Sequence, residues 1–447
     1  MTPDIGSRIQ GPLDASPMTR PQVMVICVAV LLSALDGFDV LGMAYVAPVI
    51  SRDWHLDKAV LGFLLSTSLI GMAFGSLVLS PVADVIGRRP MVFGGVSLMI
   101  LGSFLSAISQ SVPQLAAFRI LTGIGIGVVV PLTTTIAAEF SSAKGRAFAV
   151  TCTTVGFTAG SVLGSFVAAI LLRHFTWHSV FLSGAVAGLL LLPVIAFGLP
   201  ESPSFLIAKR GGNVLIDLNR VLVKLKRPIM DALPAASLTK HASYKALFAP
   251  DMIVMTACFA GVMILVSTTN YYLLNWLPQM IADAGFAPST GSLMSGISSA
   301  VAMVSGLLFG FAAFRVGPAR LGSFAMVGLG CAVVVFGMTP PKLQLLLLAV
   351  SICGVFAGGT AALFYATIAA SFPPLSRVSG IGFVTGFGRI FSVSGPALAG
   401  VLFAAGLDRD GVSFIFGAMP IVAALLLIIG ARRAGKLAES MQSTQSI

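Results

Sequence analysis

The stretch LDGFDV places two carboxylates, Asp36 and Asp39, three residues apart in a run that is otherwise almost wholly apolar from Val23 to Ile50. In a helix this spacing puts both side chains on one face. An ionised carboxylate in hydrocarbon costs about 3 to more than 10 kcal/mol, so such groups mark functional sites. Burial disfavours the charged form, which lets a carboxyl group both load and release a proton. The pair is therefore a candidate site for proton transfer.

Two arginines also lie within apolar segments, and Arg119 is the natural partner of one aspartate. At about 1.5 Å per residue, Asp39 lies about 25 Å along its segment and Arg119 about 8 Å along the oppositely directed one, so they share a level. An Asp beside an Arg stays ionised. This pairing leaves Asp36, about 21 Å along, as the proton carrier. The alternative is that both aspartates are fixed structural partners of Arg119.

Arg389 lies about 14 Å into its own apolar segment, near mid-depth. No Asp or Glu lies in the interior of the last six apolar segments. The guanidinium must therefore find backbone, water or an incoming anion, and its planar fork suits a carboxylate. We expect Arg389 to receive the carboxylate of a ligand. The alternative is that the guanidinium is structural, hydrogen-bonded to main-chain carbonyls or paired with an Asp of the first half of the chain.

Aromatic and polar side chains on the same segments are candidates to hold the rest of such a ligand, by stacking and hydrogen bonding. Since the chain has 31 phenylalanines, packing against the core or lipid is the alternative for each ring. The selected candidates are Phe38, Thr133, Tyr272, Asn275, Trp276 and Phe387, with Tyr271 and Phe383 on the same segments.

The elements that position these residues follow from composition. The 447 residues are 57% hydrophobic and 10% charged, against roughly a quarter charged in a soluble domain. The apolar runs match the roughly 20 helical residues that cross a hydrocarbon core, whereas barrel strands are shorter and alternate. We predict an all-α membrane protein with twelve transmembrane helices, at 22–50, 59–80, 91–111, 114–137, 147–172, 179–199, 251–277, 289–313, 321–340, 343–371, 380–405 and 412–431.

Basic residues predict the orientation. Twelve crossings put both termini on one side, and cytoplasmic termini would place 20 of the 27 Lys and Arg residues inside and five outside. Loops rich in Lys and Arg remain on the cytoplasmic side of a membrane. We therefore expect cytoplasmic termini and a multi-pass protein of the bacterial cytoplasmic (inner) membrane. The net charge of +11 then attracts anionic membrane lipids. A nucleic-acid role is excluded, because the chain has no soluble basic domain.

The longest polar stretch divides the twelve spans six and six. The loop SPVADVIGRRP after the second span has a degenerate counterpart, AAFRVGPAR, after the eighth, so the halves look duplicated. Internal repeats related by pseudo-two-fold symmetry are typical of secondary transporters. Within the linker, Leu215 to Lys226 is either an amphipathic helix on the membrane surface or a solvated connector. The predicted parts are a tail (1–21), an N-terminal six-helix bundle (22–199), a cytoplasmic linker (200–250), a C-terminal six-helix bundle (251–431) and a tail (432–447).

Several motifs resemble a known family. ADVIGRRP, with Asp84, Gly87, Arg88 and Arg89 in register, resembles the signature loop of the major facilitator superfamily, and FRILTGIGIG and PESPSFL resemble two further segments of it. LDGFDV, YYLLNWLPQMIADAGF and SGIGFVTGFGRIFSVSGP resemble its aromatic acid/proton symporters. The resemblance covers the whole chain and implies two six-helix bundles and alternating access. The family usually repeats an Asp-Arg pair after the eighth span, where this chain has Phe314 before Arg315.

The signature loop indicates a gate on the inner side. We expect Asp84, beside the basic pair, to cap the positive end of the eleventh span near Ser379 when the inner side is shut. Glu139 is expected to join Lys144, Arg146 or Arg377 in the same gate, a solvated carboxylate being the alternative. The predicted gating residues are Asp84, Arg88, Arg89, Glu139 and Arg377.

Glycines indicate where helices come close. Gly37 lies between the two aspartates, and Gly382, Gly386 and Gly388 lie beside Arg389. At each we expect close backbone contact with a neighbouring helix. The dipeptide Gly395-Pro396 is expected to bend the eleventh span.

The expected function is proton-coupled uptake of an aromatic carboxylate by symport, with Asp36 as proton carrier and Arg389 as carboxylate receptor. The alternative is a proton-coupled exporter of aromatic or amphiphilic compounds. Exporters typically carry a G-P-x-x-G-G-like motif in the fifth span, and GFTAGSVLGSF lacks its proline. An enzyme is excluded, because the chain offers no catalytic constellation. Its five cysteines have no metal-binding spacing, so we expect no cofactor other than the coupling proton, and a monomer.

Overall fold

The computed structural model describes residue 13 and residues 17–209, 214–233, 247–373 and 376–445. These ranges contain helices, turns and loops but no strand. Within these ranges, twelve helical segments are long and apolar enough to cross a membrane, which confirms the predicted number. Several run beyond their predicted bounds. The first, for example, extends from Arg20 to Asp53, because polar residues at helix ends continue the helix outside the apolar run.

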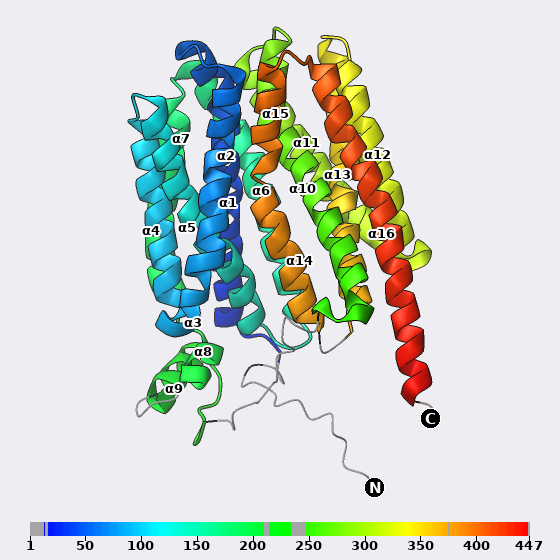
Figure 1. Cartoon of the computed structure of the whole chain (residues 1–447). Helices are drawn as coiled ribbons and strands as arrows, with labels where there is room; N and C mark the ends of the chain where they lie inside the picture. The colour runs from blue at the N-terminus through cyan, green and yellow to red at the C-terminus, as the bar shows by residue number, and fades with distance from the viewer. Residues whose placement is uncertain (1–12, 14–16, 210–213, 234–246, 374–375, 446–447) are drawn as a thin grey trace. The chain divides into compact units, whose positions relative to one another are not determined.

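Figure 1 shows the helices in chain order. The first half of the chain forms α1 (Arg20–Asp53), α2 (Lys58–Phe74), α3 (Ala83–Ile86), α4 (Arg88–Ala107), α5 (Val112–Glu139), α6 (Arg146–His174) and α7 (His178–Gly198). The linker forms α8 (Pro203–Lys209) and α9 (Val214–Lys224). The second half forms α10 (Pro250–Asp283), α11 (Pro288–Val316), α12 (Pro318–Met338), α13 (Leu343–Ser371), α14 (Arg377–Phe391), α15 (Ser394–Ala404) and α16 (Arg409–Gln445). Between α2 and α3 the second span continues as a π-helical turn, η1 (Gly75–Leu79), and a 3₁₀ turn, η2 (Ser80–Val82).

The eleventh span is interrupted between α14 and α15 (Figure 1). Pro396 has no N–H, so the carbonyl of Ser392 loses its helical partner and the ladder breaks there. The hydroxyls of Ser392 and Ser394 donate to the carbonyls of Arg389 and Phe391, at 2.6 and 2.5 Å. The expected bend is therefore present, and it begins about one turn before the proline. Arg389 lies in the last turn of α14, directly before the break.

The helices form two compact units. Unit 1 contains residues 1–40, 71–161 and 181–239, and unit 2 contains residues 41–70, 162–180 and 240–447. In unit 1, α1 and α6 touch backbone to backbone. A Cβ on Gly37 would overlap the carbonyl of Phe157, and one on Gly160 would overlap the carbonyl of Ala34. The close approach predicted at Gly37 is confirmed.

Unit 2 is organised around an apolar core shared by α10, α12, α13, α14 and α16. Phe259 of α10 packs against Phe364 and Phe372, with ring centroids 6.5 and 6.0 Å apart. Unit 2 also includes residues 41–70 and 162–180 from the first half of the chain. Such packing ties the end of α1 and most of α2 to helices that lie far along the sequence.

The linker forms a helix rather than an irregular connector. In α9, Leu218 and Leu222 are fully buried, and the helix packs against α8. The hydroxyl of Thr19 donates to the carbonyl of Leu225 at 2.8 Å, which fastens the end of α9 to the start of α1. The apolar face of this amphipathic helix is thus covered by protein.

Candidate functional site

Both aspartates of α1 are buried in unit 1, with 1% of Asp36 and 2% of Asp39 exposed. The Asp39 carboxylate accepts a hydrogen bond from the Ser103 hydroxyl of α4 at 3.2 Å. Asp36 lies one turn away on the same helix face, beside the tight contact that Gly37 makes with α6. Both carboxyl groups are thus screened from solvent.

Arg119 of α5 is fully buried and lies beside Asp39, as the depth calculation predicts. The contact differs from the expected ion pair, because Nη2 donates to the main-chain carbonyl of Asp39 at 2.6 Å. No ion pair joins the two side chains within the described ranges, since the carboxylate turns to Ser103. The guanidinium also lies over the Phe181 ring, 5.1 Å from its centroid. Its Nε and Nη1 have no hydrogen-bond partner among the described residues, so this cation retains donors for another acceptor.

Arg389 of α14 is half-buried in unit 2. Its guanidinium makes no hydrogen bond or ion pair with any residue that the structure describes. Its charge interacts electrostatically with the phenol groups of Tyr271 in α10 and Tyr365 in α13. Tyr365 is absent from the sequence-based candidates. The one feature that could have indicated it is the occurrence of a tyrosine in a largely apolar span.

The face of α14 that carries Arg389 is open. A Cβ added to Gly382 or Gly386 would meet no described atom within 4 Å, and the spacing of these glycines puts them on the side of Arg389. The expected close backbone contact is therefore wrong at both positions. Of the three glycines, only Gly388 is tightly packed, and it meets the side chain of Met263.

A stripe of rings runs along the same helix. The centroids of Phe383 and Phe387 are 5.3 Å apart, and those of Phe387 and Phe391 are 5.6 Å apart. Phe387 and Phe391 are exposed. Open space and a cation thus occur together on one face of α14, while the spacing of Phe387 and Phe391 puts these two rings on another face of the same helix.

Most of the other residues predicted to contact ligand are packed against neighbouring side chains and helices. Tyr272 stacks on Phe416 at 4.1 Å and its hydroxyl contacts Ser413, while the Trp276 indole donates to the carbonyl of Pro396 at 3.0 Å. The Asn275 amide and the Thr133 hydroxyl each donate to a carbonyl of their own helix. All four are almost fully buried and offer no surface to a ligand in this conformation. The proposed ligand site around Arg389 therefore does not include them. Phe38 is half-buried and lies against Gly184.

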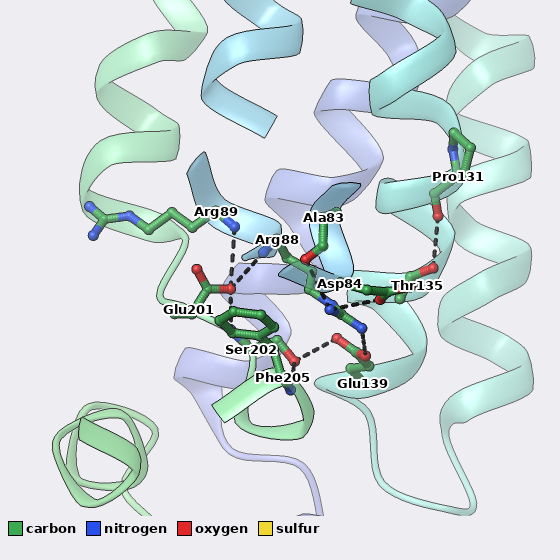
Figure 2. Close-up of polar contacts among 10 residues, drawn as sticks. All are labelled: Ala83, Asp84, Arg88, Arg89, Pro131, Thr135, Glu139, Glu201, Ser202 and Phe205. Carbon is green, nitrogen blue, oxygen red and sulfur yellow. Dashed lines mark hydrogen bonds and ion pairs between the residues drawn. The ribbon is translucent and has the colours of Figure 1, made fainter. Parts of the chain in front are cut away.

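Three of the predicted gating residues, Asp84, Arg88 and Glu139, form a polar network at the ends of α3, α4 and α5 (Figure 2). Arg88 lies at its centre, with Nη1 2.9 Å from the Asp84 carboxylate and Nη2 3.3 Å from that of Glu139. We expected Lys144, Arg146 or Arg377 as the partner of Glu139, and the structure shows Arg88. The other oxygen of Glu139 accepts from the Ser202 hydroxyl at 2.6 Å. The predicted contact of Asp84 with the eleventh span joins the two units and stays a prediction.

Glu201 completes this network and was not among the predicted residues. Its carboxylate accepts hydrogen bonds from the main-chain N–H groups of Arg88 and Arg89, at 2.8 and 3.3 Å (Figure 2). It therefore caps the positive end of α4. Gly87, just before α4, has φ of +120°, and a Cβ there would lie 2.5 Å from the Glu201 carboxylate. Only glycine permits both this backbone and this approach.

The remaining two gating residues bind carbonyls. Arg89 directs its side chain away from Glu201 (Figure 2) and donates to the carbonyl of Ala196 in α7 at 2.8 Å. Arg377 donates to the carbonyl of Phe372 at 3.3 Å. Each thus links the start of a helix to the end of another.

Replacing Glu201 should loosen this network. We expect Glu201→Ala to lower the free energy of unfolding by about 2 kcal/mol, because a charged helix cap is lost. Glu201→Gln keeps an acceptor oxygen and should lose less. Thermal unfolding of the purified protein, with the exposed Asp231→Ala as control, measures the difference. Equal unfolding midpoints for Glu201→Ala and the unsubstituted protein would contradict the capping role.

Comparison with known families identifies the chain. A sequence model of the Major Facilitator Superfamily matches residues 26–341 and 259–443. The chain belongs to this superfamily. It is accordingly a multi-pass membrane transporter and not an enzyme. Among the residues that the structure describes, no group of His, Cys, Asp or Glu is arranged to hold a metal ion.

Relatives within the superfamily are transporters of small aromatic acids by name. The chain is 29% identical to the 4-hydroxybenzoate transporter PcaK of Acinetobacter baylyi over 401 residues, which covers 88% of this chain and 87% of that protein. It is 28% identical to a gallate transporter of Pseudomonas putida over 424 residues, or 93% of each chain. These names match the family resemblance found in the motifs.

Solved structures support the superfamily fold. The crystal structure of a D-xylose-proton symporter superposes with a TM-score of 0.70, at 17% identity, over 91% of this chain and 97% of that one. An inward-open structure of the Escherichia coli xylose transporter XylE gives the same score and identity over 91% and 95%. At this level of identity the likeness concerns the fold alone.

Proposed function

We propose that the protein takes up an aromatic carboxylate together with protons across the bacterial cytoplasmic membrane, with both termini in the cytoplasm. The observation that carries the proposal is the environment of Arg389. Its guanidinium has no partner in the described ranges, interacts electrostatically with the phenol groups of Tyr271 and Tyr365, and shares one face of α14 with the open positions Gly382 and Gly386. A carboxylate attached to an aromatic ring complements these features. The names of the relatives agree with this substrate class.

Asp36 is the proposed proton carrier. Its carboxyl group is buried in the apolar first span, and a buried carboxyl group can exchange a proton when its surroundings change. The neighbouring Asp39 is bound by Ser103 through its carboxylate and by Arg119 through its main-chain carbonyl. Coupling then requires that protonation of Asp36 and binding at Arg389 favour the same conformation of the transporter. The signature-loop network around Arg88 is the proposed inner gate, which breaks and re-forms as the protein alternates.

Transport in proteoliposomes tests the proposal. Purified protein with a more acidic outside should accumulate labelled 4-hydroxybenzoate, and dissipating the proton gradient should abolish accumulation. Movement of the acid out of the vesicles against the inward proton gradient would instead establish an exporter. Absence of any gradient-dependent movement, tested with benzoate and gallate as well, would refute both proton-coupled functions.

A further inference from the structure

A hollow of about 300 Å³ lies at one end of unit 2, where α1 ends, α2 begins and α10 leads into α11. We call it the outer hollow, because this end faces outward when the termini are cytoplasmic. Its polar lining comes from Arg52, Lys58, Gln279 and Asp283. Phe286 and two prolines, Pro48 and Pro288, supply apolar surface. Cations beside a ring are the features that recognise an aromatic acid.

Lys58 is the cation best placed to bind a ligand there. It forms an ion pair with Asp283, the last residue of α10. Gln279 donates to the other oxygen of the Asp283 carboxylate at 2.8 Å and so orients it. Both charged side chains remain accessible, with 32% of Lys58 and 48% of Asp283 exposed. An exposed ion pair is weak, so a second carboxylate can compete with Asp283 for Lys58.

Arg52 adds positive charge to the hollow. Its side chain is 73% exposed, and its contact with the adjacent Asp53 is long, at 3.5 Å. It is therefore held loosely at the rim and free to reach an anion. Such rim charges mainly increase the rate at which a charged ligand associates.

The ion pair also lies at one end of a tight seam between α2 and α15. One turn along α2 from Lys58, a Cβ on Gly62 would lie only 2.7 Å from the Cα of Gly400. One turn further, the Ser66 hydroxyl donates to the carbonyl of Val393 at 3.2 Å. The Lys58–Asp283 pair thus joins α2 to α10 at the Lys58 end of this seam, so α2 must leave both helices if ligand is to enter from this side.

We infer that the outer hollow is a docking site for the carboxylate of the transported acid, which replaces Asp283 as the partner of Lys58 and thereby releases α2 from α10. This inference rests on the proposed function. A simple latch, by contrast, would involve the same ion pair without any contact to ligand. The two roles differ in how the partners of the pair respond to substitution.

The test compares Lys58→Gln with Asp283→Asn for uptake of labelled 4-hydroxybenzoate into proteoliposomes. If the hollow binds the acid, Lys58→Gln removes its receptor and should raise KM about tenfold. Asp283→Asn removes the competing carboxylate and should lower KM about threefold. The exposed Lys342→Gln, which lies on the same side in the proposed orientation, is the matched control and should leave KM unchanged.

A latch predicts that both substitutions shift KM in the same direction, because each breaks the same pair. That result, or an unchanged KM for both, would overturn the docking site while leaving uptake by the unsubstituted protein intact. Failure of the unsubstituted protein to take up any aromatic acid would overturn the proposed function as well. Asp283→Glu keeps the carboxylate and should retain the original KM, which separates loss of charge from damage to the fold.

Discussion

Asp36→Asn is expected to abolish proton-driven accumulation of an aromatic acid while exchange of the acid across the membrane continues. The amide has the shape of the protonated carboxyl group but carries no exchangeable charge, so the carrier can alternate without moving a proton. A gradient of one pH unit is worth about 1.4 kcal/mol, or roughly tenfold accumulation at one proton per neutral transport cycle. For the variant we expect equal concentrations on the two sides.

The measurement pairs gradient-driven uptake with counterflow of labelled acid in the same proteoliposomes. Asp251→Asn, which removes an exposed carboxylate at the start of α10, is the control and should accumulate normally. Retained accumulation by Asp36→Asn would show that another group carries the proton. Loss of both uptake and counterflow would assign Asp36 a structural role instead.

Arg389→Ala should weaken binding of 4-hydroxybenzoate roughly a hundredfold, because truncating one side of a charge-assisted pair costs about 3 kcal/mol. The methyl ester of the same acid lacks the charge and should bind both proteins alike. Arg389→Lys keeps the charge but not the bidentate fork, so its affinity should lie between the two. Calorimetric titration of the purified protein with acid and ester gives these ratios.

The exposed Arg320→Ala serves as control for Arg389, since it removes a guanidinium from the start of α12. Equal losses of affinity for acid and ester would contradict a carboxylate receptor and indicate general damage to the site. Unchanged affinity for both would place the ligand elsewhere.

The membrane spans and the depths of the buried charges were predictable because they follow from the length of each apolar run and from the number of residues between its start and the charge. An apolar run of fixed length must cross the membrane, and a constant rise per residue places Asp39 and Arg119 at one level. Depth does not give the direction of a side chain. In the structure the Arg119 guanidinium accordingly donates to the main-chain carbonyl of Asp39, whereas the sequence predicted an ion pair with the Asp39 carboxylate.

The ring contacts were harder to predict, because these helices are apolar on every side and the sequence does not show how each is rotated. Tyr271 and Tyr272 are neighbours in sequence, yet the phenol of Tyr271 interacts electrostatically with Arg389 and the ring of Tyr272 is stacked on Phe416 inside the core. Glu201 was missed for a different reason. Its partner Arg88 lies 113 residues away, and no pattern in PESPSFL indicates which helix end the carboxylate caps.

The open face of α14 has a consequence for changing what the transporter carries. Side chains introduced at Gly382 or Gly386 would occupy space that no described atom now fills, whereas the tight backbone contacts of this span are made by Gly395 and Gly400 of α15. If Arg389 holds the ligand as proposed, alanine or valine at these two positions would reduce the space beside it without displacing neighbouring helices. The expected result is a range of transported acids narrowed toward single small rings, which makes these two positions the natural starting point for engineered selectivity.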